Sequence, residues 1–105
     1  MKKYEIDRMK MQLFADLVNW YKSTMGFTWR TMAEGTGLSH QIFWLYGKGQ
    51  HMPKEETLNL ISNRANEIRW LRDFYFDTCA LFYGSPAETS MGKYLVDKFK
   101  RLVNS

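Results

Sequence analysis

Residues 28–61, TWRTMAEGTGLSHQIFWLYGKGQHMPKEETLNLI, decide the fold of this 105-residue chain. The pattern predicts a short helix, a tight turn, a second short helix, a basic loop and the start of a further helix. Gly37 can take the positive φ that a sharp turn between helices requires, and Ser39 can cap the helix that follows. Ala33 is small where the two helices must approach each other. The stretch therefore predicts two short helices packed across a sharp turn.

The spacing of apolar residues predicts helices on both sides of this stretch. Ile6, Met9, Leu13, Leu17 and Trp20 recur at three- and four-residue steps, which is the period of an amphipathic helix. No segment alternates apolar and polar residues for long enough to predict a strand, so we expect an all-α fold of five to six helices. The predicted helices cover about residues 4–24, 29–35, 39–47, 54–65, 66–83 and 86–103.

Glycine and proline mark several of the predicted helix ends. Gly26 and Gly84 supply left-handed positions after the first and fifth helices. Ser85-Pro86-Ala87-Glu88 has the pattern of a capping box with proline at the first helical position, and it predicts the start of the last helix. The helix over 66–83 is apolar on most sides, so it must be covered on more than one face.

The composition predicts one domain with a mild basic excess. The formal net charge is +4 and the pI is about 9.3, which is consistent with a polyanionic partner. Residues 35–54 contain two lysines, two histidines and no acid, although a window of this length can lack acids by chance. The single Cys79 cannot form an intrachain disulfide, and its apolar neighbours predict a buried structural thiol.

Nothing in the chain predicts export or insertion into a membrane. The first ten residues, MKKYEIDRMK, carry charge but are not followed by the apolar run of a signal peptide. No stretch approaches the ~20 apolar residues of a membrane span. A lone thiol also fits a reducing compartment, so we expect a cytoplasmic protein without a membrane partner.

Several residues between 27 and 61 stand at the spacing of one known family. They are Phe27-Thr28, Met32-Ala33, Gly37-Leu38-Ser39, Phe43, Tyr46 and the exit Gly49…Pro53…Glu56-Thr57-Leu58…Ile61. Through these residues, the segment 14–65 resembles the Cro/λ-repressor-like helix-turn-helix family, also called the Xre family. The resemblance implies a compact helical DNA-binding domain, usually dimeric, that acts on operators. Residues 66–105 lie outside it, as a helical extension of the same domain.

The resemblance implies that residues 39–48 form a recognition helix that lies in the major groove of double-stranded DNA. Helical geometry turns Phe43 and Tyr46 inward and Gln41 outward. The Gln41 amide can form two hydrogen bonds with the edge of an adenine, which makes it the best candidate for base reading. The alternative is that these side chains are ordinary solvated residues. The candidate base contacts are His40, Gln41, Trp44 and Leu45.

Contacts with the DNA backbone are expected at the start of the first motif helix and in the loop after the second. Free N–H groups and polar or basic side chains at these places can bind phosphates without reading sequence. The lysines could alternatively serve only solubility. The candidate residues are Thr28, Arg30, Ser39, Lys48, Gln50, His51 and Lys54.

Trp44 and Leu45 depart from the family pattern, in which these outward positions are usually small or polar. Three interpretations remain open. The pair could contact thymine methyl groups in the groove, which would favour A·T pairs. It could instead form a protein-binding patch, which would make the chain an adaptor that reuses the fold. Residues 66–105 could also fold over the pair and hide the recognition helix.

Residues 66–105 supply more apolar surface than a core of about 50 residues needs. One hypothesis is that they include a homodimer interface, since symmetric operators are read by dimers. The alternative is that they only complete a monomeric core. A regulatory protein partner is a further hypothesis, although no residue pattern identifies one. The candidate interface anchors are Trp70, Phe74, Phe82 and Phe99.

The residue pattern does not predict an enzyme. His40 and His51 stand eleven residues apart, without the cysteines or carboxylates that would complete a metal site. Glu55 and Glu56 are neighbours on a helix and diverge, and Cys79 has no histidine nearby in sequence. The sequence therefore predicts a sequence-specific, repressor-like DNA-binding regulator without metal or cofactor, with the adaptor as the alternative.

Overall fold

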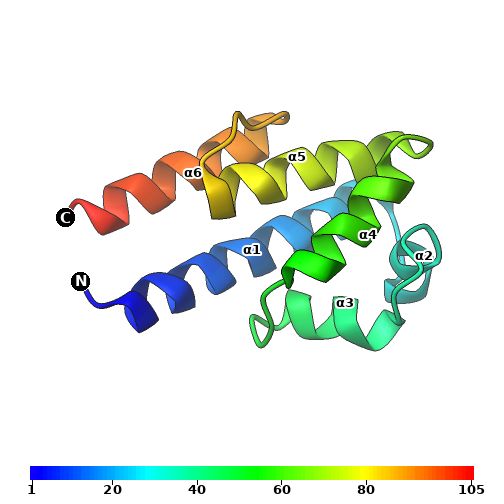
Figure 1. The fold of residues 1–105 in the computed structure, drawn as a ribbon, viewed down its shortest axis with the longest axis horizontal. Helices are drawn as coiled ribbons and strands as arrows, with labels where there is room; N and C mark the ends of the chain where they lie inside the picture. Colours follow the sequence, from blue (N-terminus) through cyan, green and yellow to red (C-terminus); the bar gives the residue numbers. More distant parts are fainter.

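The computed structural model describes all 105 residues and contains six α-helices and no strand (Figure 1). The expected all-α fold is confirmed. None of the six helices combines the length and the apolar composition that a membrane crossing requires. The helices are α1 (Lys3–Met25), α2 (Trp29–Glu34), α3 (His40–Gly47), α4 (Glu55–Ala65), α5 (Arg69–Tyr83) and α6 (Ser90–Val103).

The long helix α1 is the centre of the arrangement (Figure 1). It packs against α3 on one side and against α5 and α6 on the other, while α2 packs on α3 and α4 packs on α5. Phe14 of α1 joins these parts, because its ring lies 5.2 Å from that of Tyr46, 5.9 Å from that of Phe74 and 5.4 Å from that of Phe82. One aromatic core therefore serves both the region resembling the family and the C-terminal helices.

The turn between α2 and α3 has the local chemistry that the sequence predicts. Gly37 has a φ of 77°, and the Ser39 hydroxyl accepts a hydrogen bond from the Ile42 N–H at 3.3 Å. Thr36 adds a contact that sequence reasoning missed. Its buried hydroxyl donates to the Ala33 carbonyl at 2.8 Å and accepts from the Leu38 N–H at 3.0 Å. The turn is thus held from inside as well as by its glycine.

The predicted starts of the last two helices are wrong. The fifth helix begins at Arg69 rather than 66, because Ile68 is extended with a φ of −124°. The sixth begins at Ser90 rather than 86, and the capping box predicted over residues 85–88 does not form. Thr89 is the N-cap instead, and its hydroxyl accepts from the Gly92 N–H at 3.0 Å.

The late start of α6 has a physical cause in Asp77, a buried residue of α5. Asp77 Oδ1 accepts hydrogen bonds from the backbone N–H groups of Glu88 at 2.8 Å and Thr89 at 3.1 Å. Asp77 Oδ2 accepts from the Thr89 hydroxyl at 2.5 Å and from the Tyr21 hydroxyl at 2.7 Å. A single carboxylate therefore ties α1, α5 and the start of α6 together, and it holds residues 88 and 89 outside the helix.

Burial raises the pKa of Tyr21 strongly, and the hydrogen bond to Asp77 adds to the shift. The folded protein therefore keeps this proton at pH values where the unfolded chain, with a tyrosine pKa of 10.0, releases it. The contribution to stability is complete below pH 10 and is lost as the pH rises further.

We expect the free energy of unfolding to fall above pH 10, by up to about 1.4 kcal/mol per pH unit for each tyrosine that stays protonated. Tyr21→Phe should make this fall shallower. Burial also raises the pKa of Tyr46, so part of the slope should remain in the variant. Urea unfolding at pH 9 to 11 would measure both slopes, and equal slopes would contradict the assignment to Tyr21.

Candidate nucleic-acid interface

Helix α3 is fixed to the core by its inner face. The Phe43 side chain is completely buried, and its ring lies 5.8 Å from that of Tyr46 and 6.3 Å from that of Phe74. Met32 and Ala33 of α2 are buried beside it, as the spacing predicts. Because both short helices are anchored in this way, the outer face of α3 is presented to solvent in one defined orientation.

The outer face of α3 carries polar and apolar groups together. His40 and Gln41 are exposed in the first turn, and Trp44 follows with 41% of its surface exposed. Lys48 Nζ lies 5.4 Å from the centre of the Trp44 ring, within the range of a cation–π contact. Leu45 is half-buried, so it is less outward than expected.

The interpretation in which residues 66–105 cover Trp44 is wrong. Trp44 is exposed, and α6 lies on the opposite side of α1 from α3 (Figure 1). The C-terminal helices pack on α1 and on each other, because the shared aromatic core lies between these helices. The two other interpretations of Trp44, a groove contact and a protein-binding patch, both need an exposed side chain.

The side chains predicted for backbone contacts are all exposed and form two groups. Thr28 and Arg30 stand at the start of α2, where the Thr28 hydroxyl accepts from the Thr31 N–H at 3.1 Å. The second group flanks α3, with Ser39 at its N-cap and the rest in and around the loop that follows it. That group consists of Ser39, Lys48, Gln50, His51 and Lys54.

The C-terminal end of α3 is supported by contacts that sequence reasoning missed. Asn19 Nδ2 donates to the carbonyl oxygens of Ala15 and Gly47, each at 2.9 Å. The Trp29 ring occupies the space beside Gly47, where an added Cβ would lie 3.1 Å from Cζ2 and still closer to Cη2. Gly47 is therefore required for this close approach, whereas the sequence indicated only a helix end.

The four candidate dimer anchors all pack against the core of one chain. Phe74 has no exposed surface, so it is a core residue and cannot anchor a partner, which corrects the prediction. Trp70, Phe82 and Phe99 are half-buried. The Trp70 ring lies 5.1 Å from the Phe27 ring. The most exposed aromatic side chains of α5 are Phe76 and Tyr83, which periodicity alone did not single out.

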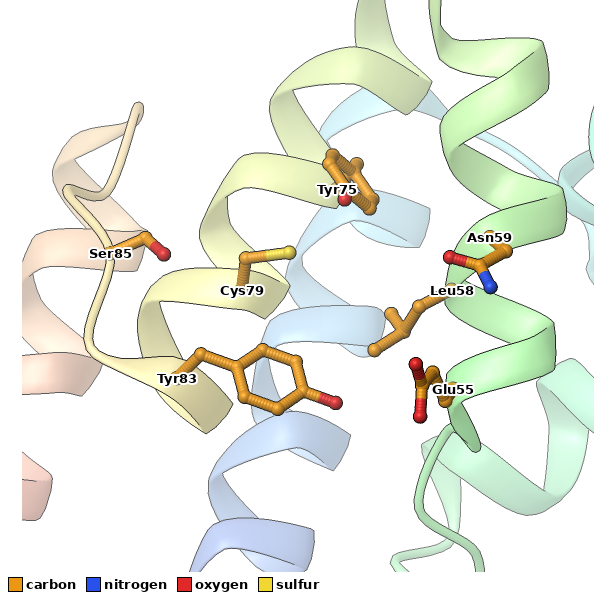
Figure 2. A pocket seen from close by; sticks show the side chains of 7 residues that line it. All are labelled: Glu55, Leu58, Asn59, Tyr75, Cys79, Tyr83 and Ser85. Carbon is orange, nitrogen blue, oxygen red and sulfur yellow. The ribbon is translucent and has the colours of Figure 1, made fainter.

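Apart from the face of α3, the structure has an open cleft between α4 and α5, with a volume of about 430 Å³ (Figure 2). Tyr75, Cys79 and Tyr83 come from α5, and Glu55 and Leu58 face them from α4. Cys79 is half-buried rather than buried, and burial raises the pKa of its thiol. This thiol is therefore protonated at neutral pH, unlike a nucleophilic cysteine, whose pKa is lowered.

No cluster of three or more His, Cys, Asp or Glu side chains could hold a metal ion. No protein family matches the chain, and neither does any curated protein or solved structure.

Proposed function

We propose that this protein is a sequence-specific, double-stranded DNA-binding transcriptional regulator of the repressor-like kind, acting as a cytoplasmic homodimer. In this proposal α2 and α3 form a Cro/λ-repressor-like helix-turn-helix, and α3 enters the major groove. The observation that carries it is the two-sided character of α3. Phe43 and Tyr46 lock its inner face in the core, while His40 and Gln41 project from its first turn into solvent.

The proposed contacts follow from the chemistry of each group. Gln41 reads an adenine edge through its amide, and His40 donates to a guanine or a phosphate. Trp44 lies where it can contact thymine methyl groups, with Lys48 beside its ring. Thr28 and Arg30 bind phosphates on one side of the groove. Ser39 does so at the N-terminus of α3. The loop side chains Gln50, His51 and Lys54 do so beyond its C-terminus.

We expect selection from random duplexes to recover a short, palindromic site. Gln41→Ala should then weaken binding to that site by about 1–3 kcal/mol and relax the preference at one base position, because the bidentate contact is lost. Asn63→Ala, an exposed amide change on α4 outside the interface, is the matched control and should leave both properties unchanged. Steep salt dependence with equal affinity for every sequence would refute specific regulation.

The alternative function is a protein-binding adaptor that uses Trp44 and Leu45. The exposure of 41% of the Trp44 surface favours it, because a large apolar side chain in solvent is a common anchor of protein interfaces. The adaptor is supported if the protein binds no DNA while Trp44→Ala abolishes binding to an identified protein partner. If Trp44→Ala instead loses specific DNA binding, this side chain contacts the groove.

The homodimer can be tested separately from DNA binding. DNA readers of this kind contact half-sites about one helical turn apart, which requires two symmetric copies. Sedimentation at micromolar concentration, with and without the selected site, measures the assembly. A 12.5 kDa species without DNA, together with a single copy bound to each selected duplex, would remove the homodimer from the proposal.

A further inference from the structure

The positive charge of this protein is concentrated at one end of the fold, away from α2 and α3. α1 and α6 run antiparallel, so the beginning and the end of the chain lie together (Figure 1). Lys10 of α1 contacts both C-terminal helices. Its Nζ lies 5.4 Å from the centre of the Phe99 ring of α6 and donates to the Phe82 carbonyl of α5 at 3.4 Å. We call residues 1–10 and 97–105 the terminal end.

The terminal end carries the whole net charge of the protein. It contains seven lysines and arginines against three acids, a net charge of +4, whereas residues 11–96 contain eight of each and are neutral. Most of these bases are exposed, and they come from both helices. The exposed ones are Lys2, Lys3 and Arg8 from the start of the chain and Lys100 and Arg101 from α6.

The segment that contains the proposed reading surface, by contrast, has no charge excess. Residues 28–56 contain Arg30, Lys48 and Lys54 but also three glutamates, so they are neutral when the histidines are neutral. Affinity for double-stranded DNA comes largely from bases that displace counterions from phosphates. The reading surface supplies three such bases, whereas the terminal end supplies five exposed ones.

We propose that the terminal end is a second DNA-binding surface, which binds the sugar–phosphate backbone of double-stranded DNA. This inference rests on the proposed function for the class of nucleic acid. It assigns base reading to α3 and sequence-independent affinity for the backbone to the exposed bases of α1 and α6. Tyr4, which is exposed beside these bases, adds a hydroxyl donor for phosphate.

The terminal end lies close to the loop after α3 along the axis of α1. The loop after α3 lies against α1 at Gln12, whose Oε1 would be 3.0 Å from a Cβ on Gly49. From Gln12 back to Lys3 the axis of α1 runs about 14 Å, at 1.5 Å per residue. The same length of DNA carries about four phosphates on each strand. The whole molecule is 38 Å long, a little more than one turn of DNA.

Nucleic acid fits this end better than a lipid surface does. A helix that inserts into a membrane interface needs a free apolar face. Most of the apolar face of α6 is occupied, because Leu95 is buried and Met91 and Phe99 pack against the core, which leaves Leu102 as its exposed apolar residue. A lipid surface would therefore have to compete with the fold for these side chains, whereas a phosphate backbone requires only the exposed bases.

Two charge-matched triple variants of the full chain test the proposal. One is Lys3→Gln with Lys100→Gln and Arg101→Gln at the terminal end. The control is Arg69→Gln with Arg72→Gln and Lys93→Gln, three exposed bases outside both surfaces. Both variants lower the net charge by the same amount, so a difference between them reports position rather than total charge.

Binding to a random-sequence duplex and to the selected site is measured between roughly 0.05 and 0.2 M salt. The terminal-end variant should lose roughly tenfold or more in affinity for both duplexes. Its slope of log affinity against log salt should flatten by up to about 2.7, that is 0.9 for each lost phosphate contact. The control should change affinity by less than about threefold, as expected of a diffuse charge effect. Circular dichroism at 222 nm checks that both variants are folded.

Equal losses in the two variants would overturn the proposal, because total charge alone would then explain them. It would also be overturned if the terminal-end variant kept its DNA affinity but lost binding to vesicles of equal parts phosphatidylserine and phosphatidylcholine. Failure of the proposed function looks different. In that case no site is selected, while the terminal-end variant still binds the random-sequence duplex more weakly than the control does.

Discussion

Asp77→Ala is expected to lower the free energy of unfolding by about 3–5 kcal/mol, because four hydrogen bonds to one carboxylate are lost together. The carboxylate is buried and accepts four hydrogen bonds, from Tyr21, from Glu88 N–H and from two groups of Thr89. Alanine would leave the buried Tyr21 hydroxyl and three part-buried donors without their acceptor, and such unsatisfied groups are costly. Thermal unfolding followed at 222 nm should show a midpoint lowered by more than roughly 12 °C.

Two further variants separate the hydrogen bonds from the charge. Asp77→Asn keeps one oxygen for the Glu88 and Thr89 N–H groups, so its loss should be only about 1–2 kcal/mol. Asp97→Ala removes an exposed carboxylate of α6 and should stay within about 0.5 kcal/mol of wild type. If Asp77→Ala and Asp97→Ala were equally stable, the four-donor site would not contribute to the fold as we describe.

Gly92→Ala is expected to destabilise the protein by about 3 kcal/mol, at the upper end of the cost of overpacking. An added Cβ at this position would overlap Asp77 Oδ1 and Cγ and would lie 2.9 Å from Oδ2. Since that carboxylate is held by four donors, it cannot move aside without losing hydrogen bonds. Urea unfolding measures the loss, and Ser90→Ala, an exposed change in the same turn of α6, serves as the control.

A double-mutant cycle identifies the cause of the Gly92 effect. In the Asp77→Ala background the colliding atoms are absent, so Gly92→Ala should cost less than about 1 kcal/mol, and the higher helix propensity of alanine offsets part of that. An equal cost in both backgrounds would show that the carboxylate is not the obstacle. The cycle thus tests whether close approach between α5 and α6 depends on this one glycine.

The sequence predicts best the features that depend on neighbouring residues. Gly37 takes its positive φ and Ser39 caps α3, because a turn and a cap involve partners within about four residues. The inward position of Phe43 and Tyr46 follows from helical periodicity in the same way. Exposure of His40, Gln41 and the backbone candidates was likewise predictable, although their binding role stays a prediction.

The failures arise where distant residues compete with local patterns. Residues 85–88 have a capping-box pattern, yet Asp77, eleven residues before Glu88, holds the backbone N–H groups there and starts α6 at Ser90. Phe74 looked like an interface anchor because its helix is apolar on most sides. Packing against Phe14, Tyr21 and Phe43 buries it completely. Neither outcome can be read from a window of sequence.

The sequence alone was sufficient for the all-α class, the turn between α2 and α3 and the two-sided character of α3, since these follow from local conformational preference and periodicity. Tertiary structure decided the rest. It exposed Trp44, placed a buried carboxylate between α1 and α6, and brought the two ends of the chain together. The physical reason is that all three features depend on which helices pack together. These features are the exposure of a side chain, the hydrogen bond between Tyr21 and Asp77 across 56 residues, and the clustering of bases from both ends of the chain. The common aromatic core around Phe14 and the Asp77 hydrogen bonds hold these helices together.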